Sequence, residues 1–319
     1  MKKIGILTSG GDAPGMNAAI NAITWAGAKA GVEIRGYQEG YNGLIDNDYR
    51  LLEPYKTSHH ANLGGTLLGS SRSERFMEPE IREKTVERLR KEGVEGLVVI
   101  GGDGSYRGAQ ALTRLGFPTV AIPGTIDNDI PLTELTLGFK TAISNVIDAI
   151  DKIATASASH SFVFVVEVMG RLAGDIALWT GTAAFADAII ASKDDYDLEA
   201  IHQKIQFSKA QHKRYQLIVL AEGVASADTF KEEMDAKFGY ELRKLALGHI
   251  QRGGNPSVDD RILGKLFGER AFEYLHNDEG PGCALGIKEN KLSEMDIEEV
   301  LGSKKRMIRP LGLKDVSNR

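Results

Sequence analysis

Residues 97–112 read LVVIGGDGSYRGAQAL, and this stretch decides the fold. It begins with an apolar, β-branched run, continues as a glycine-rich polar turn and ends in a helical pattern through Leu112. Residues 4–16, IGILTSGGDAPGM, have the same order of strand, glycine turn and helix. Continuous apolar runs are typical of strands buried on both faces, as in parallel sheets. Their alternation with helices predicts an α/β fold.

Four further apolar runs also end in glycine or polar residues: 120–122, 162–168, 217–220 and 245–250. A long helix is expected after Thr141. In open α/β folds, ligands bind beyond the carboxyl ends of the strands. We therefore expect the polar residues that follow these runs to form one composite site.

The length and composition limit the class of protein. A chain of 319 residues favours two domains of about 150 residues each. The net charge of −5 does not support nucleic acid as a partner, although small phosphorylated ligands need only a few local cations. The single cysteine, Cys283, excludes an internal disulfide and fits a reducing compartment. Because no stretch approaches the ~20 apolar residues of a membrane span, we expect a cytoplasmic protein without a membrane partner.

Both glycine turns are candidate phosphate sites. Glycine turns that open onto a helix present backbone N–H groups to anions. Each turn also carries an aspartate, Asp12 or Asp103, which suits phosphate only if a hard cation such as Mg²⁺ bridges the two. The P-loop and protein-kinase motifs are absent from the sequence, and Arg107 stands where a dinucleotide fingerprint requires glycine. The alternative for either turn is a tight strand–helix connection without a ligand.

Residues 125–129, TIDND, place two carboxylates and a hydroxyl close together. In an extended segment, Asp127 and Asp129 would face the same way. Phosphoryl transfer needs an oriented nucleophile, a base for its proton and positive charge around the moving group. One aspartate can act as the base and the other as a metal or water ligand. The alternative is an ordinary turn, which aspartate and asparagine favour.

Other charged residues are candidate ligands for the substrate. Arginine binds phosphate in a bidentate manner, and four arginines are candidates: Arg72, Arg171, Arg243 and Arg252. Arg171 and Arg252 stand out because they lie in glycine turns at strand ends. His249 is close to Arg252 and could bind a hydroxyl or a phosphate, although a lone histidine is more often structural. Glu222, at another strand end, could hold a sugar hydroxyl.

Five segments together resemble one family: residues 6–17, 101–105, 123–129, 169–171 and 248–254. The sequence is similar to the bacterial ATP-dependent 6-phosphofructokinases through nearly the whole chain, more weakly after about Gly280. The resemblance implies two Rossmann-like three-layer α/β/α lobes with mainly parallel sheets and the active site in the cleft between them. The larger, ATP-binding lobe would comprise residues 1–138 plus about 251–300. The smaller, sugar-phosphate-binding lobe would comprise residues 139–250 plus about 301–319.

The resemblance also implies an activity. The chain would be a kinase of glycolysis that uses Mg²⁺ and ATP to phosphorylate fructose 6-phosphate at its 1-hydroxyl. Small residues at Gly104 and Gly124 are typical of the ATP-using members rather than of the pyrophosphate-using ones. The family further implies a homotetramer whose sugar-phosphate sites are shared between subunits.

Residue roles follow from the same resemblance. Asp127 would be the general base, Asp103 the Mg²⁺ ligand, and the other catalytic residues would be Arg72, Arg171, Thr125 and Asp129. The ATP-binding positions would be Gly11, Tyr41, Arg72, Ser73, Gly102, Asp103, Gly104, Ser105 and Gly108. The sugar-phosphate positions would be Thr125, Asp127, Met169, Gly170, Arg171, Glu222, His249 and Arg252, with Arg243 contributed by a neighbouring subunit.

Two departures from the family bear on the substrate. Phe162 stands where the family usually has an arginine that binds the 6-phosphate across subunits, and Ser161 replaces a frequent glutamate. We expect weak or altered binding of fructose 6-phosphate and reduced cooperativity. Two alternatives stay open: a kinase for tagatose 6-phosphate or sedoheptulose 7-phosphate, and a non-catalytic sensor.

The expected effector site has lost most of its cations. Four positions that are usually basic in the family hold Asn21, Trp25, Ala154 and Gln211. Asp187 stands in place of a usual glutamate, and Lys213 is the one cation kept. We expect little or no response to ADP or phosphoenolpyruvate, because an anionic effector would lose most of its charged partners.

Overall fold

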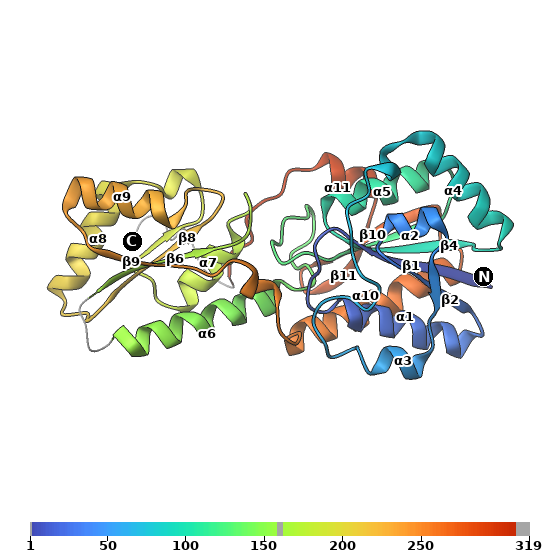
Figure 1. The fold of residues 1–319 in the computed structure, drawn as a ribbon, viewed down its shortest axis with the longest axis horizontal. Coiled ribbons are helices and arrows are strands. Elements are labelled where there is room, and N and C mark those ends of the chain that lie inside the picture. The colour runs from blue at the N-terminus through green and yellow to red at the C-terminus, as the bar shows by residue number, and fades with distance from the viewer. Residues whose placement is uncertain (1, 158–161, 311–319) are drawn as a thin grey trace. The chain divides into compact units, whose positions relative to one another are not determined.

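The structure, a computed structural model, describes residues 2–157 and 162–310. The chain divides into two compact units (Figure 1). The first comprises Met1–Thr141 and Arg252–Lys305, and the second comprises Ala142–Gln251 and Arg306–Arg319. Each unit has its own sheet, and both sheets are mainly parallel, so the predicted α/β class is confirmed. Within the described residues, no helix is both long and apolar enough to cross a membrane.

The first unit contains a seven-stranded sheet. Across the sheet its strands are β11 (Lys291–Met295), β10 (Gly282–Lys288), β5 (Thr119–Pro123), β4 (Gly96–Gly101), β1 (Lys3–Ser9), β2 (Glu33–Tyr37) and β3 (Tyr49–Leu51). The five inner strands are parallel, and β3 and β11 pair antiparallel at the two edges. In the centre, Ile6 lies opposite Val98 of β4 and Gly36 of β2. Every residue of β4 is buried, as expected for a strand covered on both faces.

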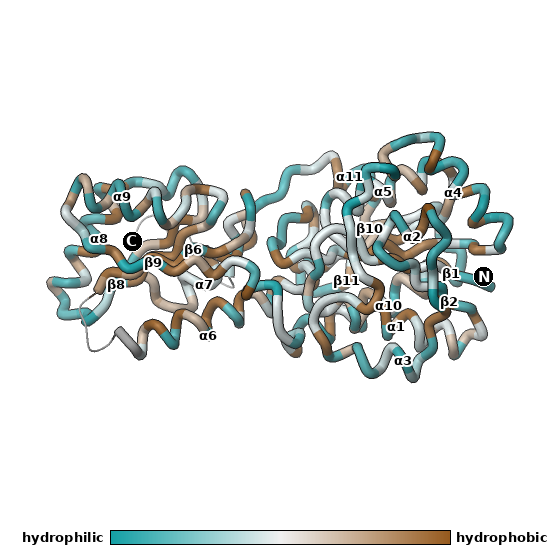
Figure 2. The backbone as a smooth tube through the Cα atoms, in the orientation of Figure 1, coloured by the Kyte–Doolittle hydropathy of each residue, from teal (hydrophilic) through white to brown (hydrophobic). Residues whose placement is uncertain are grey.

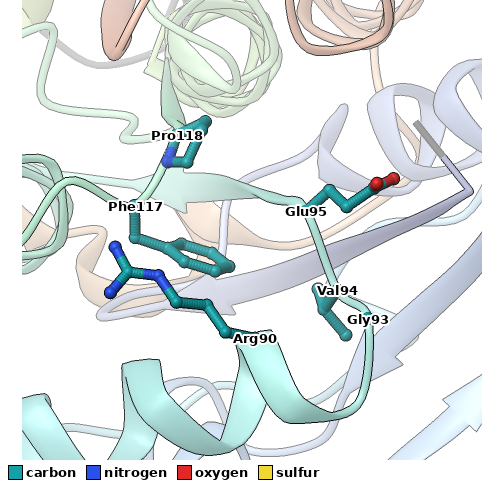
Figure 3. Close-up of a pocket in the computed structure, with 6 residues that line it drawn as sticks. All are labelled: Arg90, Gly93, Val94, Glu95, Phe117 and Pro118. Atoms are coloured by element: carbon teal, nitrogen blue, oxygen red, sulfur yellow. The ribbon is translucent and has the colours of Figure 1, made fainter.

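Helices cover both faces of this sheet (Figure 1). One group is α2 (Tyr41–Asp46), α4 (Pro79–Lys91), α5 (Asp103–Arg114) and α11 (Ile297–Gly302), whose apolar residues share one buried cluster with the strands. The other group is α1 (Met16–Ala30), α3 (Pro54–Ser58) and α10 (Val258–His276). Figure 2 shows the outer helix α4 as mostly polar, in keeping with its exposed charged side chains.

Helices α1 and α10 pack unusually closely. A Cβ atom at Gly264 would lie 2.7 Å from the Gly15 carbonyl oxygen, and one at Gly268 would lie 2.5 Å from that of Ala19. The two glycines are four residues apart, so they lie on one face of α10 and let it approach the backbone of α1. This contact places the start of α10 directly beside the loop that follows β1.

The second unit contains a four-stranded parallel sheet with the order β7 (Ala188–Ile190), β8 (Gln216–Ala221), β6 (Val163–Val168) and β9 (Leu242–Ala246). Its core includes apolar residues of α8 (Leu198–Ala210) and α9 (Ala227–Phe238), which lie on one face in Figure 1. Helix α7 (Asp175–Ala183) packs against β7 and β8. Helix α6 (Phe139–Ser157) begins in the first unit and belongs to the second from Ala142 onward.

The prediction of a strand at residues 245–250 is wrong. Strand β9 ends at Ala246, and residues Gly248–Arg252 form a short 3₁₀-helix. Gly248 has a φ of 51°, and the Gln251 amide donates a hydrogen bond to the Gly248 carbonyl oxygen at 3.0 Å. Ile250 is 69% exposed, so the apolar run in the sequence does not correspond to a buried strand.

Candidate active site

The two glycine loops lie side by side in the first unit. From β1 the chain proceeds to β2 on one side of the sheet, whereas β4 and β5 lie on the other, so the strand order reverses between β1 and β4. Such a switch point is where open α/β sheets bind ligands. The Ser105 hydroxyl joins the loops by donating a hydrogen bond to the Ser9 carbonyl oxygen at 2.9 Å. The glycine turns that were predicted separately therefore form one surface.

The second loop opens onto free space at the start of α5. A Cβ atom at Gly104 would meet nothing within 4 Å, and one at Gly102 would come no closer than 3.8 Å to Thr125. The unpaired N–H groups and the dipole of a helix N-terminus favour an anion at such a place. The geometry is thus suited to phosphate oxygens, which approach backbone closely only where side chains do not intervene.

Asp103 is the first residue of α5, and its carboxylate accepts a hydrogen bond from Arg107 Nε at 3.0 Å. No group of three or more His, Cys, Asp or Glu side chains within residues 2–157 and 162–310 is arranged to hold a metal ion. Mg²⁺ is commonly bound by one or two carboxylates together with substrate phosphates and water. A single half-exposed carboxylate beside a phosphate-binding loop fits this mode of binding, with Arg107 as its competitor.

Tyr41 and Gly108 lie behind the loop rather than on its open side. The Tyr41 side chain is 4% exposed, and its hydroxyl donates a hydrogen bond to the Ser105 carbonyl oxygen at 2.7 Å. A Cβ atom at Gly108 would lie 2.4 Å from that ring, so glycine there lets Tyr41 reach the loop. Burial raises the pKa of Tyr41 well above its usual range. We therefore assign both residues a supporting role and not the nucleotide contact expected from the sequence.

The aspartate turn follows β5, the neighbour of β4. It is not extended, as the sequence argument assumed, because Asn128 has a left-handed φ of 52°. The Asp127 N–H donates to the Thr125 hydroxyl at 3.2 Å, and the Thr136 hydroxyl donates to the Thr125 carbonyl oxygen at 2.6 Å. Asp127 is only 1% exposed, whereas Asp129 is half-buried. The two carboxylates of the turn thus differ in their burial.

The loop that carries Arg72 and Ser73 runs beside the first glycine loop. The Ser70 hydroxyl donates a hydrogen bond to the Gly10 carbonyl oxygen at 2.6 Å, which fixes this segment. The Ser73 hydroxyl accepts a hydrogen bond from the Phe76 N–H at 3.3 Å. Arg72 is exposed. The structure thus brings the predicted ATP-binding residues of three segments to one edge of the sheet.

Arg252 also belongs to the first unit, where it touches the first glycine loop. Its Nη1 atom donates a hydrogen bond to the Asp12 carbonyl oxygen at 3.2 Å. A Cβ atom at Gly11 would lie 2.5 Å from the same nitrogen. An arginine expected to bind the sugar phosphate therefore lies against a loop expected to bind ATP.

In the second unit, the Met169–Arg171 turn follows β6. Gly170 and Arg171 both have positive φ values, of 129° and 48°. The Arg171 N–H donates to the Glu222 carboxylate at 3.2 Å, and a Cβ atom at Gly223 would lie only 1.8 Å from the Arg171 carbonyl oxygen. Glu222 therefore holds the backbone of the turn, while the Arg171 side chain is exposed.

Sequence reasoning missed the role of Gln251. This side chain is fully buried, and it accepts a hydrogen bond from the Met169 N–H at 3.1 Å while donating to Gly248. It thereby joins the turn after β6 to the turn after β9. His249 and Arg243, which are close to Gln251 in the sequence, are both exposed. The only signal for Gln251 was its place inside the 248–254 segment, because its partner Met169 is 82 residues away.

Comparison with known proteins identifies the family. The family model described as phosphofructokinase matches residues 3–275 of this chain. The chain belongs to the phosphofructokinase family. A protein of Ligilactobacillus salivarius named ATP-dependent 6-phosphofructokinase is 49% identical over 319 residues, which cover 100% of this chain and 99% of that protein. A protein of Halalkalibacterium halodurans with the same name is 49% identical over 304 residues, or 95% of both chains.

Solved phosphofructokinases have the same fold. The structure of phosphofructokinase from Saccharomyces cerevisiae matches with a TM-score of 0.88 and 31% identity, over 94% of this chain and 45% of the yeast chain. This phosphofructokinase thus spans less than half the length of the yeast chain. A pyrophosphate-dependent phosphofructokinase from Marinobacter aquaeolei matches with a TM-score of 0.79 over 96% of this chain and 86% of that chain. Its 22% identity shows a shared fold only.

Phe162, one of the two positions expected to depart from the family, is built into local contacts. Phe162 lies beneath Arg243, whose guanidinium carbon is 4.8 Å from the ring centroid. Arg243 also forms an ion pair with Glu241 at 2.9 Å. Ser161 lies outside the described residues.

Four of the expected effector positions also form side-chain contacts within the chain. The Asn21 side-chain oxygen accepts a hydrogen bond from Thr57 at 2.8 Å, and Trp25 donates to Ser58 at 2.9 Å. Asp187, with a 4% exposed side chain, forms an ion pair with Lys213 at 2.8 Å. Lys213, the cation expected at an effector site, is therefore already paired with a carboxylate.

Proposed function

We propose that this phosphofructokinase transfers the γ-phosphoryl group of ATP to the 1-hydroxyl of D-fructose 6-phosphate, forming fructose 1,6-bisphosphate and ADP. The observation that carries the proposal is the position of Asp127, a buried carboxylate in the turn that follows β5. This turn lies beside the glycine loop that follows β4, since a Cβ atom at Gly102 would lie 3.8 Å from Thr125. The full-length identity to two proteins named ATP-dependent 6-phosphofructokinase supports the donor and the acceptor.

Asp127 is the general base in this proposal. It accepts the proton of the 1-hydroxyl as the sugar oxygen bonds to the γ-phosphorus and the bond to the β-phosphate oxygen breaks. The hydrogen bonds of Thr125 and Thr136 hold the turn that orients the carboxylate. Phosphoryl transfer is catalysed mainly by such positioning and by charge stabilisation. Arg72 and Arg171 supply positive charge, and Asp129 acts as a second carboxylate near the reaction.

The donor is ATP rather than pyrophosphate. Gly104 faces open space, which leaves room for the rest of the nucleotide beyond its phosphates. A Cβ atom at Gly124 would lie 2.8 Å from Met16 Cε and 3.3 Å from the Gly101 nitrogen, so a larger residue there would disturb the loop. Asp103 would hold Mg²⁺, which when bound neutralises charge on the phosphates. Gly11, Ser73 and the segment 102–105 complete the ATP site.

For the sugar phosphate, we assign Met169, Gly170, Arg171, Glu222 and His249 in the second unit. Arg252, in the first unit, is assigned to the same ligand. We propose a cytoplasmic homotetramer in which Arg243 of a neighbouring subunit completes the site. Because Lys213 is already paired with Asp187, ADP and phosphoenolpyruvate should have little effect.

A second candidate is a kinase for another sugar phosphate, tagatose 6-phosphate or sedoheptulose 7-phosphate. The observation that favours it is the apolar ring of Phe162 beneath Arg243, where a second cation was expected. A non-catalytic sensor has less support, because Asp103, Asp127, Arg72 and Arg171 are all present.

The first experiment measures initial rates with Mg·ATP and each of the three sugar phosphates, and repeats the series with pyrophosphate. Saturable turnover that prefers fructose 6-phosphate and ATP supports the proposal. The Asp127→Ser variant should lose orders of magnitude in kcat, whereas Asp278→Ser, at an exposed loop carboxylate, should not. Equal turnover by wild type and Asp127→Ser would exclude the assigned base. A preference for another sugar phosphate would leave the kinase assignment and change the substrate.

A further inference from the structure

Asp260 is a fully buried carboxylate that has no role in the mechanism above. It lies in the first turn of α10, and its backbone N–H donates to the hydroxyl of Ser257, the residue that caps this helix, at 3.2 Å. Burial raises the pKa of Asp260, and hydrogen bonds from Thr141, Gly138 and Ser257 oppose that shift. A carboxylate is costly in such a place unless its hydrogen bonds are satisfied.

The carboxylate accepts hydrogen bonds from three residues in two segments of the first unit. Oδ1 accepts the Gly138 N–H at 2.9 Å, and Oδ2 accepts both the N–H of Thr141 at 2.8 Å and its hydroxyl at 2.5 Å. Oδ2 also accepts the Ser257 hydroxyl at 3.2 Å. The Thr141 hydroxyl in turn accepts the Ser257 N–H at 2.9 Å. Asp260 therefore caps the start of α6 from another helix, satisfying N–H groups that have no partner within α6.

These contacts join the segments that flank two proposed substrate-binding residues. Gly138 comes shortly after Thr136, which holds the Asp127 turn, and a Cβ atom at Gly138 would lie 3.0 Å from the Ile126 side chain. Ser257 lies in the segment that begins with Arg252. The Asp260 carboxylate thus connects the segment that holds the Asp127 turn to the segment that begins with Arg252.

The same contacts lie where the chain leaves and re-enters the first unit. Thr141 is the last residue before the second unit, and Arg252 is the first residue after it. Within the first unit, the Asp260 side chain therefore anchors both the segment that ends at Thr141 and the segment that begins at Arg252. Removing an acceptor from this point would free the outgoing and returning segments together.

We propose that Asp260 is a positioning residue that holds the Asp127 turn in register with Arg252, and so acts on the sugar-phosphate half of the reaction. This inference rests on the proposed function. The carboxylate forms none of its hydrogen bonds with residues 101–105, so its removal leaves the second glycine loop in place. The expected effect is therefore selective for the sugar phosphate over ATP.

The test replaces the carboxylate by an amide of the same size. In Asp260→Asn, the amide nitrogen cannot accept the Thr141 N–H. We expect kcat/KM for fructose 6-phosphate to fall about 10- to 100-fold, the range for loss of a hydrogen bond to a charged group, and KM for ATP to change less than about 2-fold. The matched control is Asp259→Asn, at the exposed neighbour in the same helical turn, which should behave as wild type.

A second pair of variants keeps the carboxylate and changes its partner. Thr141→Val removes the hydroxyl but keeps the shape of the side chain, whereas Thr141→Ser keeps the hydroxyl. The proposal expects Thr141→Val to show the same selective loss to a smaller degree, and Thr141→Ser to retain wild-type values. This pair decides the question if Asp260→Asn does not fold.

Amide hydrogen exchange provides a readout that does not need catalysis. Residues 136–141 and 253–257 should exchange faster in Asp260→Asn, while residues 101–105 keep their wild-type rates. A uniform rise throughout the first unit, or equal losses toward both substrates, would show a purely structural role and overturn the proposal. Kinetics and exchange rates of Asp260→Asn that are identical to those of the wild type would also overturn the proposal. If the wild type does not phosphorylate fructose 6-phosphate, the proposed function fails while the exchange pattern still decides the role of Asp260.

Discussion

The guanidinium of Arg252 lies on the backbone of Gly11: a Cβ atom at residue 11 would come within 2.5 Å of Nη1, which donates a hydrogen bond to the next carbonyl in the chain. The two residues are more than 200 positions apart in sequence, yet both belong to the first unit. A loop proposed to bind ATP therefore supports an arginine proposed to bind the sugar phosphate. The position of the arginine thus depends on the absence of a side chain at residue 11.

Gly11→Ala tests this contact. The added methyl group must displace the end of the Arg252 side chain, which is flexible, so the fold should remain stable. KM for fructose 6-phosphate should rise about 10-fold, as expected for loss of one charge-assisted hydrogen bond. Steady-state kinetics with thermal unfolding as the stability check measure both effects. Gly302→Ala is the control, because a Cβ atom there meets nothing within 4 Å. An equal rise in KM in Gly302→Ala would show that the effect does not come from the contact between Gly11 and Arg252.

Arg107→Ala should lower the Mg²⁺ concentration needed for half-maximal rate. Arg107 pairs with Asp103 at the start of α5, and the two side chains are 64% and 48% exposed. Exposed pairs of this kind are worth roughly 0.2–1 kcal/mol, so freeing the carboxylate corresponds to a change of about 1.4- to 5-fold. The measurement is a Mg²⁺ titration at fixed ATP and low salt. Lys265→Ala, which breaks the exposed Lys265–Glu269 pair of α10, is the control. A higher Mg²⁺ requirement in Arg107→Ala would mean that Arg107 itself binds phosphate.

Local patterns were enough to predict the glycine loops and the strands β1, β4, β5, β6 and β8, but they misplaced β9. Each of these features depends on residues adjacent in sequence, such as the apolar run 97–100 and the turn after it. The contacts of Tyr41 with Ser105, of Gln251 with Met169 and of Asp260 with Thr141 were not predictable. The two partners are 64, 82 and 119 residues apart, respectively. The aspartate turn was misjudged for a different reason. Side-chain alternation was assumed there, whereas Asn128 has a positive φ and forms hydrogen bonds with Glu134 and Thr136.

Phe162→Arg should strengthen the binding of fructose 6-phosphate. The aromatic ring beneath Arg243 offers a cation–π contact, which is worth about 0.5–1 kcal/mol at an exposed site, but no charge for a 6-phosphate. A second arginine adds a charged hydrogen bond of about 1.5–3 kcal/mol, or roughly 10- to 150-fold in affinity. Steady-state titrations of wild type and variant measure the change, with Phe164→Leu as the control for the loss of the Phe162–Phe164 ring contact. Micromolar, sigmoidal dependence on fructose 6-phosphate in the wild type would contradict this account.

Glu279→Gln should make the protein less stable at neutral pH but not in strong acid. Arg270 donates to both oxygens of the Glu279 carboxylate and also pairs with Glu294 at 2.6 Å, so it ties the loop after α10 to β11. The hydrogen bonds from Arg270 lower the pKa of Glu279 from its usual 4.5 to about 2. A lowered carboxyl pKa contributes stability that is fully present above pH 4.5 and is lost as the pH falls toward 2. The wild type and Glu279→Gln should therefore differ most in urea midpoint near pH 7, and the difference should shrink steadily between pH 4.5 and pH 2.

Glu273→Gln is the control, because that carboxylate is 60% exposed and lies 3.7 Å from Arg270. A wild-type advantage that stays constant across this range would show that Glu279 acts through packing, not through its charge.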